Sequence, residues 1–364
     1  AHWVADHNAI STLPRERFLM RLGGEWSPEE RAVFDTLRPR PEDLERDYPS
    51  YWDWRNMGGT TPVKNQEDCG SCWGFAAVGA TEGNLRINEG VIYDLSEQQV
   101  LDCNTGGSSC DGGSTASAYQ VLRDPGAVSE DDMPYLGVES TCRQKLYEKV
   151  ALIDGFSYIA GNIDSYKAAL MDGPISACYT VYEDFNAYSG GCYEYTWGGV
   201  DAGHCITIVG WDDSMCSGQG AWICKNSWGP GWGVAGYFYI KYDECGIGSG
   251  AQQPINAHIP RQRLVPDEFG TIQGAIDNSN RGDIIRVAGG TYQENVSVAD
   301  YRVLYGGYDP TFQIRDSVVY PTIVDANASG DGFLISNRTH VVVDGFEVMN
   351  ADGTNDYGVY INTS

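Results

Sequence analysis

The sequence lacks the features of a membrane-spanning or nucleic-acid-binding protein. None of its apolar runs approaches the ~20 residues that a bilayer-spanning helix needs. Its 24 lysines and arginines are outnumbered by 50 aspartates and glutamates, and the formal net charge of −26 argues against nucleic acid as a partner. No signal peptide is visible and Ala1 is not a methionine, so we expect that a leader was removed or left out of this chain.

Cysteine, by contrast, is abundant, with 11 residues in a chain of 364. If one cysteine serves as a nucleophile, the remaining ten are enough for five disulfides. Disulfides persist in oxidising compartments, so this count predicts a secreted or extracellular protein.

One of these cysteines, Cys72, lies in a stretch with the form of an activated-thiol site. The residues from Cys72 to Arg86 lack proline, are rich in Gly and Ala, and carry apolar side chains at Phe75, Val78 and Leu85. This pattern predicts a closely packed helix that begins at Cys72. Backbone N–H groups at a helix N-terminus stabilise a thiolate, which is the nucleophilic form of cysteine.

Three other side chains complete the predicted catalytic set. His204 opens an apolar run and would accept and return the proton, because histidine titrates near neutrality. Asn226 would orient the imidazole, and Gln66 would donate its side-chain N–H to an oxyanion beside the Cys72 amide. A redox dithiol or half a zinc site at Cys69 and Cys72, or a structural histidine, remain alternatives. None of them needs Gln66 and Asn226, so we expect no metal and no cofactor.

The motifs Cys69-Gly70-Ser71-Cys72-Trp73, Gly203-His204 and Asn226-Ser227-Trp228-Gly229 resemble those of papain-like cysteine proteases. The resemblance covers roughly Tyr48 to Gly250. It implies an α+β fold of two lobes, one helical around Cys72 and one β-barrel-like around His204, with a peptide in the cleft between them. It also implies an endopeptidase that hydrolyses peptide bonds through a Cys72 thiolate acyl-enzyme and is made as an inhibited proenzyme.

The resemblance implies a substrate-binding site as well. Gly112 and Gly113 would pair with the substrate backbone, and Trp228 would shield the hydrogen bond of Asn226. A pocket would hold the side chain two residues before the scissile bond, and its lining would be Ser114, Thr115, Cys178, Ala202, Cys205 and Gly250. No acidic residue matches the pocket floor, so the sequence predicts a preference for small or medium apolar side chains.

The same resemblance pairs Cys69 with Cys110 and Cys103 with Cys142. A third family bridge ends near Cys245, but the usual cysteine just before His204 is absent here, and Cys216 is the predicted substitute. Cys178 and Cys205 fall in the pocket and are candidates to cross-link two neighbouring strands. The pairing of Cys192 and Cys224 stays open.

We predict three parts in the chain: a pro-segment at 1–47, a peptidase domain at 48–257 and a truncated parallel β-helix at 258–364. In the first part, Ser27-Pro28-Glu29-Glu30 predicts a capped helix start, and 14–22 an earlier helix. The proline-stiffened stretch Arg38-Pro39-Arg40-Pro41 is expected to cross the cleft. Carboxylates at 42–47 are expected to hold the segment down by pairing with arginines. A disordered tail is the alternative.

The last part carries alternating apolar residues punctuated by Gly, Asn and Asp. Phe269–Ile276 resembles the entry cap of right-handed parallel β-helices of the pectate-lyase-like class. Gly332–Ile335 and Gly358–Ile361 recur 26 residues apart, and such coils bury their apolar faces only by stacking. A small β-sandwich is the alternative fold. The alternative functions are a polysaccharide- or surface-binding protein whose protease serves maturation, and a catalytically silent homologue.

Overall fold

The computed structural model describes residues 3–328, 330–336, 338, 340–351 and 358–362. The chain divides into two compact units, Ala1–Ile259 and Pro260–Ser364. Within the described chain, the helices are all too short or too polar to cross a bilayer.

Residues 3–47, here called the N-terminal segment, fold as part of the first unit. They form β1 (Trp3–Ala5), α1 (Arg15–Leu19), α2 (Pro28–Thr36) and α3 (Pro41–Leu44). Helix α2 begins where the sequence predicts, because the Ser27 hydroxyl accepts from the Glu30 amide while the Glu30 carboxylate accepts from the Ser27 amide. The segment is therefore ordered rather than a loose tail.

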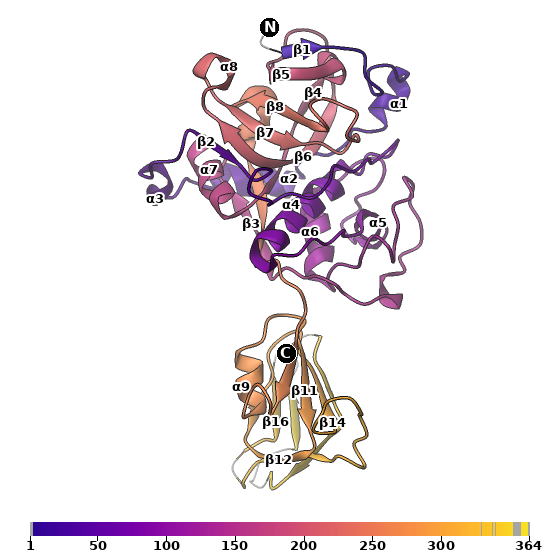
Figure 1. Cartoon of the computed structure of the whole chain (residues 1–364), viewed down its shortest axis with the longest axis vertical. Helices are drawn as coiled ribbons and strands as arrows, with labels where there is room; N and C mark the ends of the chain where they lie inside the picture. The colour runs from indigo at the N-terminus through magenta and orange to yellow at the C-terminus, as the bar shows by residue number, and fades with distance from the viewer. Residues whose placement is uncertain (1–2, 329, 337, 339, 352–357, 363–364) are drawn as a thin grey trace. The chain divides into compact units, whose positions relative to one another are not determined.

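Helices α4 (Cys72–Glu89), α5 (Glu97–Cys103) and α6 (Thr115–Arg123) lie together on one side of the first unit, the helical side, and most of the strands gather in a sheet beside them (Figure 1). Small residues let α4 approach its neighbours closely: a Cβ atom on Gly79 would lie 2.7 Å from the Thr207 hydroxyl oxygen. The predicted helix from Cys72 is confirmed, and it ends at Gly90 in the left-handed conformation that favours glycine.

The strand side is a sheet whose described strands run in the order β1-β5-β8-β7-β6-β4-β9-β3, with β2 paired to β6. The long strand β6 lies at its centre and pairs antiparallel with β4 and β7. The strand bounds are β2 Tyr51–Asp53, β3 Gly155–Ile159, β4 Ile175–Tyr182, β5 Tyr188–Tyr193, β6 Val200–Asp212, β7 Ala221–Lys225, β8 Tyr237–Lys241 and β9 Ala251–Ile255. The remaining helical turns are η1 Gln144–Leu146, α7 Ile163–Asp172, η2 Glu183–Ala187, α8 Met215–Gly218 and η3 Glu244–Ser249.

Disulfides join four pairs of the described cysteines: Cys69–Cys110, Cys103–Cys142, Cys178–Cys205 and Cys192–Cys216. The first three agree with the pairs named from the sequence. The predicted Cys216–Cys245 bridge is wrong, because Cys216 pairs with Cys192. Strand β5 carries Cys192 and pairs with β8, which is remote in sequence, and Cys192 shares a buried cluster with Cys216. Cys72, Cys224 and Cys245 are free.

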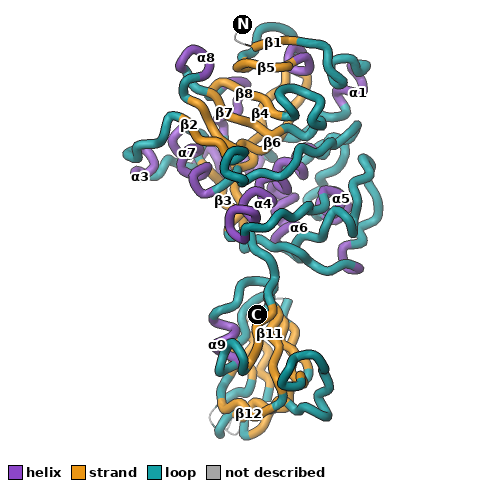
Figure 2. Tube along the Cα trace, viewed as in Figure 1, coloured by secondary structure: helices purple, strands orange, loops and turns teal. Residues whose placement is uncertain are grey.

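The second unit is built from parallel strands. The chain visits three sheets in turn, and each strand pairs with its equivalent from the preceding pass. The sheets are β10 Gln262–Val265, β11 Ile284–Ala288, β14 Val303–Tyr308, β17 Val342–Asp344; β12 Gly290–Gln293, β15 Thr322–Asp325, β18 Phe346–Met349; and β13 Val296–Ser297, β16 Phe333–Ser336, β19 Val359–Asn362. Helix α9 (Ile272–Asp277) packs beside them (Figure 2). Aligned apolar residues such as Ile285, Leu304 and Val343 stack in register along the first sheet.

Candidate active site

The Cys72 sulfur lies at the first position of α4 and is fully buried. The amide of Cys205, on the neighbouring strand β6, donates a hydrogen bond to it at 3.5 Å. The amides of Gly24, Trp73 and Cys72 itself also point at the sulfur and favour its thiolate form. The sequence therefore placed this thiol correctly at the amino end of a helix.

His204 precedes Cys205 on β6, and its hydrogen bonds fix which ring nitrogen carries the proton. Its Nε2 atom lies 2.8 Å from Asn226 Oδ1, an atom that also accepts the Ser227 amide at 2.8 Å. Because Oδ1 only accepts, Nε2 must donate and holds the proton of the neutral ring. The other nitrogen, Nδ1, is buried and makes no hydrogen bond within the described part of the chain. His204 therefore keeps a bare basic nitrogen.

Aromatic rings cover this pair of side chains. The ring centres of Trp228 and His204 lie 4.7 Å apart, and those of Trp232 and Trp228 lie 4.8 Å apart. Asn226 is 2% exposed, so water has little access to its bond with His204. The structure thus brings Trp228 to the place expected from the sequence.

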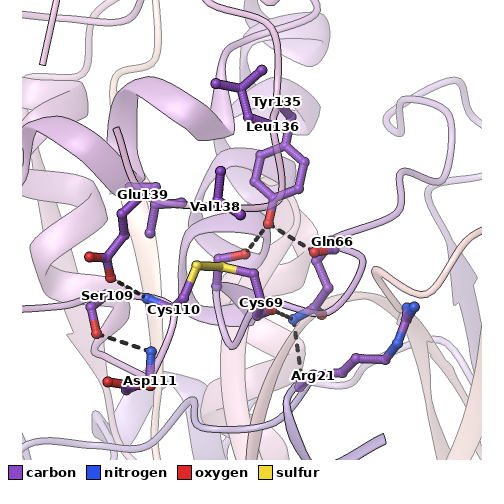
Figure 3. Close-up of a disulfide and its surroundings, with 12 residues drawn as sticks. Arg21, Gln66, Cys69, Ser109, Cys110, Asp111, Tyr135, Leu136, Val138 and Glu139 are labelled. Atoms are coloured by element: carbon purple, nitrogen blue, oxygen red, sulfur yellow. Dashed lines mark hydrogen bonds between the residues drawn. A yellow bond between two sulfur atoms is a disulfide. The ribbon is translucent and has the colours of Figure 1, made fainter. Parts of the chain in front are cut away.

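Gln66 joins the helical and strand sides at the same place. Its Oε1 atom accepts from the Ser227 hydroxyl at 2.6 Å, and its Nε2 atom donates to the Cys69 and Arg21 carbonyls at 2.7 and 3.0 Å. Figure 3 shows this amide between Cys69, held by the disulfide to Cys110, and the backbone of Arg21. The donor expected to meet an oxyanion is therefore occupied by a carbonyl of the N-terminal segment.

The N-terminal segment crosses the site in extended form at 22–25. Gly113 donates to the Gly23 carbonyl at 3.1 Å and accepts from the Glu25 amide at 3.2 Å, while the Gly23 amide donates to Gly203 at 2.8 Å. A Cβ atom on Gly24 would lie 2.6 Å from the sulfurs of both Cys72 and Cys205. Backbone at this position therefore covers the Cys72 sulfur directly.

This crossing corrects one sequence prediction. The stretch 38–41 does not line the site; it leads into α3, and the glycines at 23 and 24 cross instead. Glycine suits this path because the segment touches backbone on both sides: a Cβ atom on Gly112 would lie 2.3 Å from the Gly23 carbonyl oxygen.

The ion pairs that hold the segment also differ from the expectation. Arg40 pairs with Glu42 and Asp43, all within the segment. The pairs that reach the rest of the unit are made by arginines of the segment. Arg17 and Arg21 both pair with Asp68, and Arg15 pairs with Asp201 and Glu183.

Burial sets the protonation of the site while the segment covers it. Burial raises the pKa of the Cys72 thiol to about 11, against the opposing effect of the surrounding backbone amides. Burial also lowers the pKa of His204 to about 4, although its hydrogen bond to Asn226 acts in the other direction. At neutral pH both groups are therefore uncharged, and the thiolate expected from the sequence is not the stable form in this state.

The predicted pocket is occupied in part by α2 and the turn before it. Phe34 packs on Gly250, where a Cβ atom would come within 2.3 Å of its ring, and Trp26 packs against Phe34 with ring centres 4.8 Å apart. Beside this pair, Cys178 and Ala202 line a cavity of about 690 Å³. Ser114 caps α6, since its hydroxyl accepts from the Ala116 amide.

Two buried polar residues near Thr115 were missed by sequence reasoning. The Thr115 hydroxyl donates to Gln252 Oε1 at 2.6 Å, and Gln252 Nε2 donates to the Glu30 carboxylate at 2.8 Å. Nothing in the local sequence marks Gln252, because it lies in an ordinary strand pattern. The capping-box pattern predicts the contact of Glu30 with Ser27, but it does not predict the contact of Glu30 with Gln252.

Comparison with known proteins agrees with this architecture. The model of the papain family cysteine proteases matches residues 48–255. Cathepsin L2 of Homo sapiens is 36% identical over 259 aligned residues, covering 68% of this chain and 76% of that protein. Fruit bromelain of Ananas comosus is 39% identical over 191 residues, covering 52% and 54%.

Solved structures include proenzymes of similar fold. The digestive procathepsin L2 of Tenebrio molitor larval midgut is 30% identical with a TM-score of 0.62, covering 70% of this chain and 84% of that one. The ragweed pollen allergen Amb a 11, a cysteine protease in its proform, is 28% identical with a TM-score of 0.62, covering 70% and 82%. This chain belongs to the papain family of cysteine proteases and is a papain-like cysteine peptidase.

Proposed function

We propose that this chain is the inhibited proenzyme of a secreted endopeptidase in which Cys72 is the nucleophile. The observation that carries the proposal is the bare Nδ1 nitrogen of His204, buried one residue from the amide that contacts the Cys72 sulfur. The proton of the thiol passes to Nδ1, and the resulting sulfur anion attacks the carbonyl carbon of the substrate.

The remaining residues then act on the charge that develops. The negative oxygen of the tetrahedral intermediate receives hydrogen bonds from Gln66 Nε2 and the Cys72 amide. His204 returns its proton to the leaving amine, which releases the first product and leaves an acyl group on the sulfur. Water, deprotonated by His204, hydrolyses this acyl-enzyme. Asn226 holds the ring in the required orientation throughout.

We further propose that residues 1–47 inhibit this chemistry until they are cleaved near Arg46–Tyr48. Support comes from the contacts of the segment with both halves of the site: the Arg21 carbonyl occupies Gln66, and Gly24 covers Cys72. Secretion is supported by the disulfides, which persist in oxidising compartments.

The test is peptide hydrolysis by the processed chain and by its Cys72→Ala variant. We expect the variant to lose all measurable turnover while its thermal unfolding stays close to that of the parent. Cys224→Ala is the matched control, because Cys224 is also a buried free thiol and lies on β7, outside the catalytic set. Turnover by Cys72→Ala above a few per cent of the parent would refute the assignment.

For the second unit, we infer a stretch of parallel β-helix that serves as an attachment or spacer module. The support is the repeated visit to three parallel sheets and the stacked apolar residues between them. Removing the last pass, from residue 337 onward, should expose stacked apolar residues such as Phe333 and lower the unfolding temperature of this unit alone. An unchanged unfolding temperature would contradict stacking as its source of stability.

A further inference from the structure

A buried polar chain runs from the wall of the pocket into the N-terminal segment. It consists of Thr115, Gln252 and Glu30, joined by hydrogen bonds of 2.6 and 2.8 Å. Thr115 and Gln252 are fully buried, and Glu30 is 2% exposed. Burying such groups is unfavourable unless they are hydrogen-bonded, so each member of the chain depends on the others.

One face of α2 delivers both the apolar and the polar contact. Glu30 and Phe34 are four residues apart, a spacing that places them on the same side of a helix. Phe34 covers Gly250, and Glu30 reaches Gln252. Gln252 therefore lies beside the residues expected to receive the substrate side chain, and a carboxylate already occupies the position next to it.

The orientation of the Gln252 amide follows from its partners. The Thr115 hydroxyl donates to Oε1, so this oxygen faces the wall and Nε2 faces Glu30. When the N-terminal segment leaves, Thr115 stays, and Nε2 then points into the vacated space as a hydrogen-bond donor. A buried donor without a partner costs more than a formed hydrogen bond contributes.

We propose that Gln252 determines substrate choice by selecting a side chain with a hydrogen-bond acceptor two residues before the scissile bond. Glutamine and glutamate have an acceptor on a stem of the length that Glu30 uses, whereas leucine and methionine would leave Nε2 unpaired. This replaces the apolar preference predicted from the sequence. The inference rests on the proposed function, since it concerns the substrate of that same site.

The experiment uses the full chain after processing, with active sites counted by a thiol-specific titrant. Four peptides that differ only at this position, carrying Gln, Glu, Leu or Met, are compared by kcat/KM. We expect Gln to exceed Leu by about tenfold, the effect of one buried hydrogen bond against an unpaired donor.

Three variants test whether Gln252 sets the substrate preference. Two of them change Gln252 itself, and the third changes Thr115, which orients the Gln252 amide. Gln252→Leu should reverse the order and favour Leu, while Gln252→Glu should discriminate against the Glu peptide through like charge. Thr115→Val leaves Gln252 in place but removes the bond that orients its amide, so it should narrow the ratio of Gln to Leu without abolishing cleavage of the Leu peptide.

Gln253→Leu is the matched control. It is the same substitution one residue along β9, where the side chain donates to the Ala169 and Gly173 carbonyls. Its ratio of Gln to Leu should equal that of the parent. If the parent cleaves the Leu peptide better than the Gln peptide, or if Gln252→Leu keeps the parent's ratio of Gln to Leu, this inference is wrong but the proposed function still stands. Hydrolysis of none of the peptides by titratable enzyme would overturn the proposed function and this inference with it.

Discussion

Gly24→Ala should expose the Cys72 thiol without any cleavage of the chain. The added methyl carbon would lie 2.6 Å from the sulfurs of Cys72 and Cys205, and 2.9 Å from the Cys205 amide nitrogen. Ordinary contact begins near 3.4 Å, so the N-terminal segment must move away by about 0.8 Å to restore it. Its neighbours there include backbone of the sheet and a disulfide, which cannot yield as a flexible side chain would.

The magnitude follows from the hydrogen bonds beside this glycine. Three backbone bonds link Gly23 and Glu25 to Gly113 and Gly203, at 2.8 to 3.2 Å. At about 1 kcal/mol each, their loss removes about 3 kcal/mol of docking free energy. The population of molecules with an open site should therefore rise roughly 100-fold.

The assay is alkylation of Cys72 by iodoacetamide from pH 6 to 9, followed by peptide mass spectrometry with Cys224 as an internal reference. In the covered site, burial raises the pKa of Cys72 to about 11. Only about one thiol in a thousand is then ionised at pH 8, and the rate should climb tenfold per pH unit. The released chain should instead react well below pH 8, because hydration and the helix N-terminus favour the thiolate.

Gly231→Ala is the control, since Gly231 is exposed and a Cβ atom there meets nothing within 4 Å. It should be alkylated at the rate of the parent. If Gly24→Ala is also alkylated at the parent rate while its chain stays intact, the segment does not cover the thiol in solution and the reasoning fails.

Three further variants test other contacts of the site. Gln66→Ala should lower turnover by roughly 10²–10³ if its amide meets the oxyanion, and unchanged turnover would show that Gln66 only fills space. Asn226→Ala should lower turnover less than Cys72→Ala does, because His204 can still accept the proton in some orientations; an equal loss would contradict a purely orienting role. Asp68→Asn removes the partner of two arginines of the N-terminal segment, so self-processing should be roughly 5- to 30-fold faster, given about 1–2 kcal/mol for the pairs. An unchanged processing rate would show that these pairs do not hold the segment.

The places of the residues proposed as catalytic were predictable because they lie in short local patterns. The helix from Cys72 follows from composition and the absence of proline, and the glycine and apolar runs place His204 on β6 and Asn226 directly after β7, the strand that pairs with β6. The resemblance to papain-like proteases also predicted the disulfides Cys69–Cys110 and Cys103–Cys142. Local sequence placed each motif on its element, and the resemblance supplied which of these distant motifs meet in space.

The prediction failed where sheet order decides the contact. Cys192 meets Cys216 because β5 joins the sheet beside β8, a parallel pairing between strands more than 40 residues apart that no local pattern encodes. The crossing point of the N-terminal segment was misplaced for a similar reason. Proline stiffness at 38–41 suggested an extended path, but the narrow space over Cys72 admits only backbone without side chains, which Gly23 and Gly24 provide.

The proposed inhibition and the proposed specificity involve the same stretch of the N-terminal segment. Arg21 supplies a carbonyl to Gln66, Gly24 covers the sulfur, and Glu30 and Phe34 fill the pocket. Each of these contacts meets a part of the site that a substrate would use. A substitution that removes the Gln252 donor must therefore also weaken the binding of Glu30, because an unpaired buried carboxylate is unfavourable. Substrate preference at Gln252 and retention of the segment are thus coupled through one hydrogen bond.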